Sequence, residues 1–431
     1  MSYTLISMLG TGMYKTRTNF EGYEETDYFF WQGKHFKTRL FMQALLEGKY
    51  KNINQIIILG TNTSSWDCLI DKDNDSRDET IQLWSDLFDQ CESKEISVSP
   101  KGVSRENLDK LEKYLSERFS TEVLIKEHTH SVDNNTSKEL FECYTGITKL
   151  VKKENDILFD ITHGFRSMPV LLYQSLQYSL SQSTAHSVSI VYGELDLVDR
   201  SKAYVRNLSN YWDYSELSIA LNIFKTKLDG FKLSELISSS WSSGSKAIKR
   251  FSEIVQTNFS LQILDVIPQI RNALTKYPAN APSWLESIKP ILEEICKLKN
   301  EKFMARTLYN YSQFLYEHQL NVQAVITLQV AVETCIAELY GEEDSIGNYE
   351  WWQETGRKEL NKLKFPNNHE YGSNNKKQIG LPLNNLENFR NQIAHGGGKN
   401  KAGNFPQAAN IPGIYESGIR GIKNLFELLG I

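Results

Sequence analysis

The sequence predicts a Rossmann-like α/β domain with a parallel sheet, followed by an all-α region. Strand-like apolar runs alternate with amphipathic helical runs through the first half, which is typical of βαβ units in a doubly wound sheet. Only helical periodicity continues after about Tyr211. Because 431 residues exceed what one core usually organises, we expect several domains. We place an α/β domain at 1–207, a helical connector at 208–300 and a helical bundle at 301–431.

Short runs rich in Ile, Leu and Val mark the strands of the first domain. Their expected ranges are 3–9, 54–59, 121–126, 156–161 and 187–192. Amphipathic runs between them predict helices near 36–47, 79–91, 105–119, 138–153 and 170–181. Two further segments, 17–32 and 193–205, are expected to form hairpins.

The second half shows helical spacing throughout. Helices are expected at 215–228, 247–255, 261–274 and 288–298, and apolar stripes recur at helical spacing beyond residue 300. The serine-rich stretch 238–245 is expected to be a loop between helices. The polar, Asn-rich stretch 341–378 fits an insertion between helices of the bundle, and the sequence suggests no role for it.

Composition indicates a soluble globular protein of the cytoplasm. Hydrophobic residues make up 40% and charged residues 23%, and no apolar run approaches the ~20 residues of a membrane span. A net charge of -5 argues against broad affinity for nucleic acid, although a local basic cleft is compatible with it. The cysteines are scattered, odd in number and without a CxxC pair, which favours reduced thiols over disulfides or zinc: Cys68, Cys91, Cys143, Cys296 and Cys335.

Polar, glycine-containing stretches follow three of the expected strands. Because the carboxyl ends of parallel strands lie at one edge of a sheet, we expect these stretches to form one ligand site. Glycines admit close approach of a ligand, and hydroxyls and amides suit phosphate or ribose. Neither a complete dinucleotide fingerprint nor a P-loop is present, but three such stretches at one edge of the sheet favour a nucleotide-like ligand. The candidate binding residues are Gly10, Thr11, Gly12, Tyr14, Thr61, Ser64, Thr162, His163, Gly164 and Arg166.

The strand-to-helix turn at 160–169 is the most informative of the three stretches. It places a hydroxyl, an imidazole, a glycine and a guanidinium within five residues, from Thr162 to Arg166. Free backbone N–H groups at the start of the next helix, together with Arg166, favour an anion such as phosphate. Alternatively, Thr162 caps that helix and Arg166 pairs with a carboxylate. The turn by itself supports both interpretations equally.

A second candidate site lies at the end of an expected helix in the bundle. Arg390 and Asn391 lie about one turn before His395, and the three glycines at 396–398 are expected to end the helix there. The expected buried stripe of this helix consists of Leu383, Leu386, Phe389 and Ile393. On spacing alone, a helix end whose Arg and His complement the helix dipole is the simpler interpretation.

Taken together, the two sites resemble a known family. Asp160-Ile161-Thr162-His163-Gly164 is similar to the Asp-x-Thr-His-Gly signature of CRISPR-associated proteins with an N-terminal CARF domain. The stretch from Arg390 and Asn391 to His395 resembles the Arg-x4-His motif of HEPN ribonucleases. The order and separation of the two motifs make the pair more specific than either motif alone, and the resemblance spans the whole chain.

The resemblance implies an auxiliary ribonuclease of type III CRISPR defence, active as a homodimer or a higher oligomer of dimers. It implies that the strand-end residues bind a cyclic oligoadenylate, with cyclic tetra-adenylate as the expected activator. It further implies that Arg390, Asn391 and His395 cleave single-stranded RNA without a metal or other cofactor. No membrane and no DNA partner are expected.

The chemistry of the residues agrees with that implication. No metal-ligand spacing occurs near His395, so the attacking group is expected to be the 2′-hydroxyl of the RNA. His395 suits proton transfer, Arg390 suits stabilisation of the phosphorane charge, and Asn391 suits orientation of phosphate or His395. Two other classes stay open: a ligand-sensing adaptor without catalysis, and an enzyme that degrades its own activator at the N-terminal site.

Overall fold

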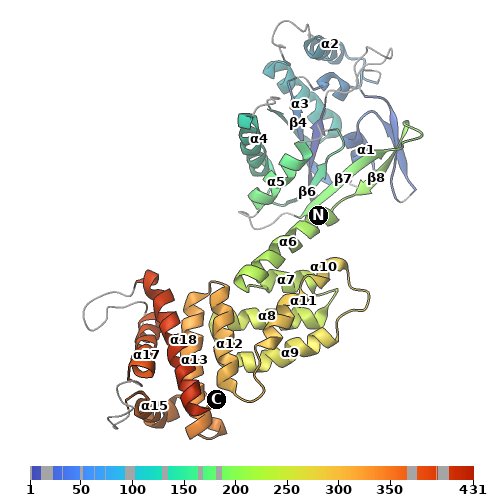
Figure 1. Cartoon of the computed structure of the whole chain (residues 1–431). Coiled ribbons are helices and arrows are strands. Elements are labelled where there is room, and N and C mark those ends of the chain that lie inside the picture. Colours follow the sequence, from blue (N-terminus) through green and yellow to red (C-terminus); the bar gives the residue numbers. More distant parts are fainter. Residues whose placement is uncertain are drawn as a thin grey trace. The chain divides into compact units, whose positions relative to one another are not determined.

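A computed structural model describes residues 2–10, 23–31, 33–48, 52–62, 64–72, 74–92, 102–128, 134–163, 168–180, 187–365, 376–394, 396 and 407–431. The chain forms two compact units, Met1–Tyr214 and Ser215–Ile431 (Figure 1). The sequence placed the end of the α/β domain at residue 207, a few residues before the end of the first unit. The division of the helical half at residue 300 stays a prediction.

The first unit contains one eight-stranded sheet with the order β3-β2-β8-β7-β6-β1-β4-β5. Five neighbouring strands, from β7 to β5, run parallel, whereas the β7–β8 and β2–β3 pairs are antiparallel. The strands are β1 (Ser2–Leu9), β2 (Thr26–Phe29), β3 (His35–Thr38), β4 (Ile53–Thr61), β5 (Glu122–His128), β6 (Asn155–Asp160), β7 (Val188–Leu195) and β8 (Lys202–Asn207). The predicted α/β class and its parallel strands are confirmed.

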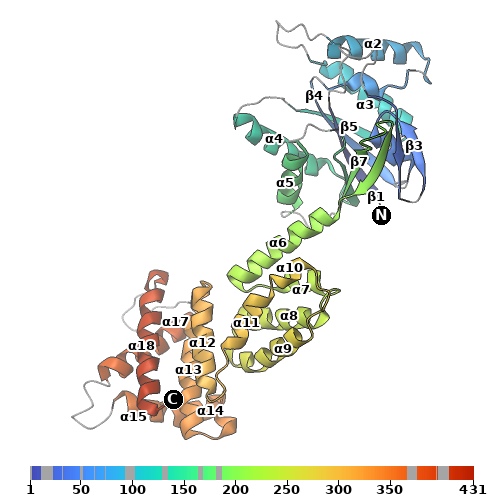
Figure 2. The same ribbon diagram turned by 45° about the vertical axis from the view of Figure 1, so that its right-hand side comes forward.

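Helices cover both faces of this sheet, which is why its central strands are buried at nearly every position. Successive residues of β1 alternate between two separate cores, with Leu5 in one and Ile6 in the other, and both are fully buried. The first core contains side chains of α1 (Phe41–Glu47), α2 (Asp78–Glu92) and α3 (Arg105–Phe119). The second contains side chains of α4 (Asn134–Ile147) and α5 (Met168–Leu180). These two helices lie next to each other (Figure 2).

Two expected elements were placed wrongly. The helix expected at 36–47 begins only at Phe41, because His35–Thr38 instead forms β3, hydrogen-bonded to β2. Pairing across the sheet here overrides the helical spacing of the sequence. The serine-rich stretch expected as a loop enters a helix at Ser242, where α8 (Ser242–Thr257) begins after the buried Trp241. The hairpin expected at 193–205 is confirmed as β7–β8.

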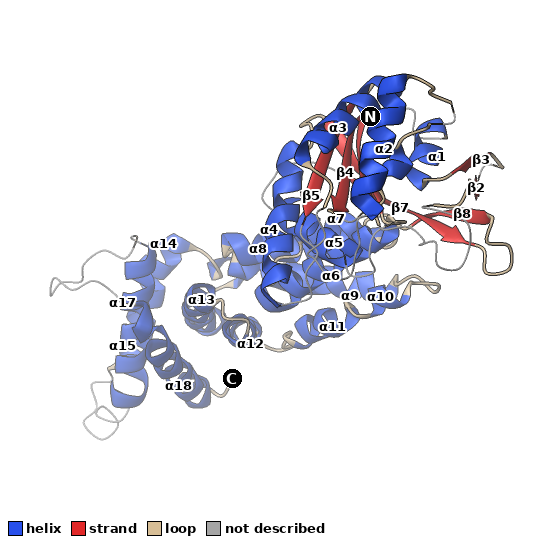
Figure 3. Cartoon of the chain, turned by 90° about the horizontal axis from the view of Figure 1, so that it is seen from above, coloured by secondary structure: helices blue, strands red, loops and turns tan. Residues whose placement is uncertain are grey.

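The second unit is helical in the residues that the structure describes (Figure 3). One hydrophobic cluster extends through it from Leu217 to Phe426. Its helices are α6 (Asn210–Lys227, which begins in the first unit), α7 (Phe231–Ile237), α8, α9 (Ile263–Thr275), α10 (Ser283–Glu286), α11 (Lys289–Lys297), α12 (Met304–Glu317), α13 (Asn321–Tyr340), α14 (Tyr349–Trp351), α15 (Arg357–Lys364), α17 (Leu381–Ala394) and α18 (Ile411–Leu429).

Four helices form the part of this unit that carries the second motif. Helix α12 packs along α13, α17 packs along α18, and α13 contacts both α17 and α18. By length and composition, α13 is apolar enough to cross a membrane, and 61% of its apolar window is buried inside the unit. A core helix passes the same test, and Leu328 and Val332 of α13 are fully buried among the other helices.

Candidate functional site

The three polar strand ends lie side by side, because β1 pairs in parallel with β4 on one side and with β6 on the other. Gly10 follows β1, Thr61 ends β4 and Asp160 ends β6. The backbones approach so closely that a Cβ atom on Gly10 would lie 2.5 Å from the carbonyl oxygen of His163. Only glycine fits at this point, which explains one residue of the predicted first loop.

Buried hydrogen bonds tie the loop after β4 to the end of β1. The Ser64 hydroxyl donates to the carbonyl oxygen of Leu9 at 2.7 Å and accepts from the Thr61 N–H at 2.8 Å. The Ser65 N–H donates to the Gly10 carbonyl at 3.0 Å. Thr61 and Ser64 are fully buried, so the structure assigns both side chains to holding the loops. Their direct contact with a ligand stays a prediction.

Asp160 and Thr162 anchor the turn after β6. One Asp160 carboxylate oxygen accepts from the Ser7 hydroxyl at 2.6 Å, and the other accepts from the Thr162 N–H at 2.8 Å. The Thr162 hydroxyl oxygen accepts from the Gly193 N–H at 2.9 Å, which connects the turn to β7. Asp160 is fully buried, and this burial raises the pKa of its carboxyl. The turn is therefore braced by neighbouring strands before any ligand arrives.

His163 braces the turn on its other side. Its Nε2 atom accepts from the N–H of Phe41, the first residue of α1, at 3.1 Å. Its ring lies edge-on to Tyr23, whose hydroxyl accepts from the Gly10 N–H at 2.9 Å. Burial lowers the pKa of His163 to about 4. The imidazole is thus neutral near pH 7, with its proton on Nδ1.

This geometry gives one ring nitrogen of His163 a role in the fold. Nε2 accepts a backbone hydrogen bond, and the neutral ring offers no positive charge to phosphate. Contact of His163 with a ligand, as the sequence predicts, stays a prediction. Part of the predicted ligand site lies outside the described residues, namely Thr11, Gly12, Tyr14, Gly164 and Arg166.

The second site lies at the end of α17. Leu383, Leu386 and Phe389 are buried as predicted, and Ile393 packs against the same core. The helix ends at Ala394, and Gly396 adopts a φ of +70°, with its N–H donating to the Ile393 carbonyl at 3.0 Å. This is the expected glycine stop. His395 itself lies outside the described residues.

The guanidinium of Arg390 is held by a residue that sequence reasoning missed. Its Nη2 atom lies 2.9 Å from Oε1 of Glu333 on α13, and about a quarter of each side chain is exposed. The same carboxylate oxygen accepts from Nε2 of Gln329 at 3.0 Å. Burial raises the pKa of Glu333. The sequence did contain a signal for this contact, because Gln329 and Glu333 are polar residues one turn apart in the mostly apolar helix α13.

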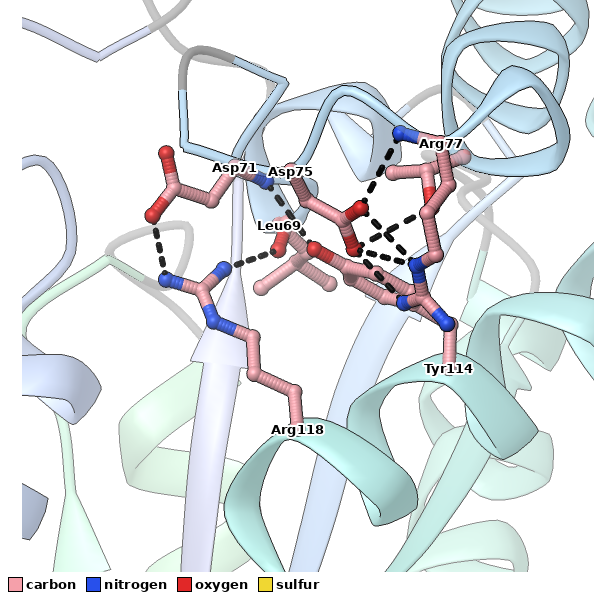
Figure 4. Close-up of polar contacts among 7 residues, drawn as sticks. Leu69, Asp71, Asp75, Arg77, Tyr114 and Arg118 are labelled. Atoms are coloured by element: carbon pink, nitrogen blue, oxygen red, sulfur yellow. Dashed lines mark hydrogen bonds and ion pairs between the residues drawn. The ribbon is translucent and has the colours of Figure 1, made fainter.

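A separate polar cluster in the first unit consists of ion pairs near the surface (Figure 4). Arg77 binds both carboxylate oxygens of Asp75, and Arg118 pairs with Asp71 at 2.8 Å. Tyr114 accepts from the Asp71 N–H, so the cluster fastens the loop before α2 onto α3. Within the described part of the chain, no group of three His, Cys, Asp or Glu side chains is arranged to hold a metal ion.

Comparisons with known proteins add to this geometry. Residues 4–194 match the family described as the CARF domain of CRISPR system endoribonuclease Csx1. The CRISPR-associated protein MJ1674 of Methanocaldococcus jannaschii is 23% identical over 358 residues, which cover 79% of this chain. The same alignment covers 55% of the relative, so the chain spans about half of that protein's length.

Among solved structures, Enterococcus italicus Csm6 bound to cyclic hexa-2′-fluoro-hexa-dAMP is similar to this chain with a TM-score of 0.40 and 11% sequence identity. That likeness covers 99% of this chain and 95% of the other chain. The region matched by the family, 4–194, contains all three strand ends described above, with the hydrogen bonds made by Thr162 and His163. Residues 4–194 are therefore similar to the CARF domain of the Csx1 family, and the chain is similar over most of its length to a CRISPR-associated protein.

Proposed function

We propose that the protein is a cyclic-oligoadenylate-activated endoribonuclease that cleaves single-stranded RNA without a metal ion in type III CRISPR defence, in the cytoplasm. The observation that carries the proposal is the combination of two features in one chain. Residues 4–194 match a CARF domain, and the helical unit carries Arg390 and Asn391 near the end of α17, about one turn before His395. The helical unit is assigned to the HEPN class on this motif.

The adjacent strand ends support an anionic nucleotide as the ligand of the first unit. Their backbones are packed against each other at Gly10 and His163, and buried hydrogen bonds fix Ser64 and Thr162. We infer that backbone N–H groups at this edge and the following Arg166 bind the phosphates, and a fixed edge would lose little conformational entropy on binding. Cyclic tetra-adenylate is the expected ring.

The RNA chemistry follows from the residues at the end of α17. The substrate's 2′-hydroxyl attacks the adjacent phosphorus, the bond from phosphorus to the 5′-oxygen breaks, and a 2′,3′-cyclic phosphate and a 5′-hydroxyl result. His395 moves a proton, Arg390 stabilises the additional negative charge, and Asn391 orients the phosphate. Each chain supplies only one copy of Arg390, Asn391 and His395. We therefore assign the active site to a homodimer in which the two copies meet across a two-fold axis.

The deciding experiment uses the full-length protein and labelled single-stranded RNA in EDTA. Cleavage is expected with cyclic tetra-adenylate and is expected to be absent without an activator, with cyclic hexa-adenylate as a second arm that tests ring size. Products ending in 2′,3′-cyclic phosphate support the mechanism. Activator binding without RNA cleavage would indicate an adaptor, and consumption of the ring alone would indicate an activator-degrading enzyme.

Two binding measurements test the remaining parts of the proposal. Arg166→Ala should weaken cyclic tetra-adenylate binding in calorimetry, and excess activator should restore part of its RNA cleavage. Light scattering should show a dimer. Wild-type affinity in Arg166→Ala would remove Arg166 from the binding site, and a fully active monomer at nanomolar concentration would overturn the two-chain active site.

A further inference from the structure

Helix α17 carries a row of three polar side chains, one turn apart, that leads to the second motif. Asn384 and Glu387 contact Lys364 of α15, whose Nζ atom lies 2.9 Å from Oδ1 of Asn384 and 3.4 Å from Oε2 of Glu387. Arg390, the third of the row, contacts Glu333 of α13. Lys364 is only 1% exposed, and burial lowers its pKa. The helix with the motif is therefore fixed by charged side chains from two other helices.

Glu387 is the natural competitor for Arg390. Opposite charges three residues apart on one helix are neighbours and attract each other. Both oxygens of Glu387 are nevertheless occupied by other cations, Oε1 by Arg357 at 3.3 Å and Oε2 by Lys364. These two cations belong to the stretch 341–378, for which the sequence suggested no role. Arg390 pairs with Glu333 instead, at 2.9 Å.

We propose that Glu333 is the positioning residue for the Arg390 guanidinium, and that Arg357 and Lys364 of the 341–378 insertion keep Glu387 from competing for it. This inference rests on the proposed function, since positioning Arg390 has a chemical consequence only if Arg390 meets the scissile phosphate. Glu333 accepts a hydrogen bond from Nη2 of Arg390, and this contact sets the direction of the planar Arg390 guanidinium.

The electrostatics of the cluster support this arrangement. A guanidinium fixed before the substrate arrives stabilises developing charge without reorganisation, whereas a free Arg side chain must first lose rotamer entropy. With all five side chains ionised, the three cations Arg357, Lys364 and Arg390 exceed the two anions Glu333 and Glu387 by one charge. In that ionisation state the cluster keeps a net positive charge for a phosphate although Arg390 is already paired.

The first test separates turnover from binding. Glu333→Ala should lower kcat of activated RNA cleavage on the order of 10²-fold, as expected for a misplaced catalytic group, with little change in KM. Glu333→Gln should retain much of the rate, because its amide oxygen still accepts from Arg390. Glu333→Ala added to Arg390→Ala should cause no further loss. Glu301→Gln, an exposed glutamate paired with Arg271 in the same unit, is the matched control and should leave kcat unchanged.

The second test asks whether a change in the 341–378 insertion can be compensated by a second substitution at Glu387. Arg357→Gln releases one oxygen of Glu387, which should then draw Arg390 away from Glu333 and lower kcat severalfold. Glu387→Gln in the same chain removes the competing charge and should restore the rate. A purely structural role for Arg357 predicts no such rescue. Thermal unfolding of each variant verifies that the protein is folded.

The outcomes distinguish this inference from the proposed function. If the wild type cleaves RNA and Arg390→Ala does not, but Glu333→Ala has the wild-type kcat, the inference alone is overturned. Additive losses from Glu333→Ala and Arg390→Ala would also overturn it, because Glu333 would then act independently of Arg390. If the wild type cleaves no RNA with either cyclic ring, the proposed function fails, and the inference fails with it.

Discussion

The two motifs of this chain are held in opposite ways. In the turn after β6, Thr162 and His163 use their side chains as acceptors for backbone N–H groups of Gly193 and Phe41. At the end of α17, the Arg390 side chain is instead held by another side chain, the carboxylate of Glu333, at a partly exposed position. The Thr162 and His163 side chains therefore hold backbone groups of the fold, whereas the second motif keeps a charged group near solvent.

This difference separates two kinds of motif residue. A buried N–H that loses its acceptor costs free energy of unfolding, so changes at Thr162 or His163 should appear first as instability. A partly exposed guanidinium contributes little to folding and much to any charge that develops beside it, so changes at Arg390 should appear first in the rate. The variants below test this distinction.

The largest effect is expected at Arg390. Arg390→Ala should lower activated RNA cleavage on the order of 10²–10³-fold or more, since it removes the charge that we propose stabilises the phosphorane. His395→Ala should abolish cleavage as well. Both variants should bind cyclic tetra-adenylate with wild-type affinity in calorimetry, because neither residue lies within the matched range 4–194. Cleavage at the wild-type rate in either variant would remove the second motif from catalysis.

Thr162→Val should act on stability. Valine keeps the shape of the side chain but leaves the Gly193 N–H without its acceptor, at a cost of about 1–3 kcal/mol in the free energy of unfolding. Thr162→Ser keeps the hydroxyl and serves as the control. Denaturant unfolding measures the difference. If Thr162→Val kept the wild-type stability but lost activator binding, Thr162 would be a ligand contact and not a residue that stabilises the fold.

His163 should make the stability of the first unit dependent on pH. Its folded pKa of about 4 lies below the ordinary value of 6.5, so the unfolded chain takes up the proton first as the pH falls. This contribution to stability is complete above about pH 6.5 and is lost between pH 6.5 and 4, by roughly 2 kcal/mol at pH 5. The His163→Gln variant has no imidazole at this position, so its stability lacks this pH-dependent contribution.

The measurement for His163 compares unfolding of the wild type and His163→Gln across this pH range. Other groups, such as Asp160 with its raised pKa, titrate in both proteins and cancel in the difference. The wild type's advantage over the variant should shrink as the pH falls. Parallel stability curves would show that the imidazole is not held neutral by the fold.

The smallest effect is expected at Arg77. Its pair with Asp75 has good geometry, yet the Arg77 side chain is mostly exposed and Asp75 partly exposed, so screening and side-chain entropy cancel most of the attraction (Figure 4). Arg77→Ala should leave the thermal midpoint and the RNA cleavage rate unchanged within error. A marked loss in either would mean that the cluster beside α3 contributes more than a loop attachment.

Much of this protein was determined by local pattern in the sequence. The order of apolar runs predicted the α/β unit and its parallel strands, since burial on both faces of a sheet requires continuous apolar residues. The stripe of Leu383, Leu386 and Phe389 predicted the buried face of α17, and the glycines after residue 395 predicted its end. Such features depend on residues within one or two turns of each other, so a single sequence contains them.

Only the tertiary structure decided which polar groups meet. His163 accepts from Phe41, 122 residues away, and Arg390 pairs with Glu333, 57 residues away, although Glu387 lies within a turn of it. Strand pairing likewise made β3 from residues with helical spacing. The physical reason is that hydrogen bonds and ion pairs depend on distance in space and on desolvation, and both are set when distant segments pack together.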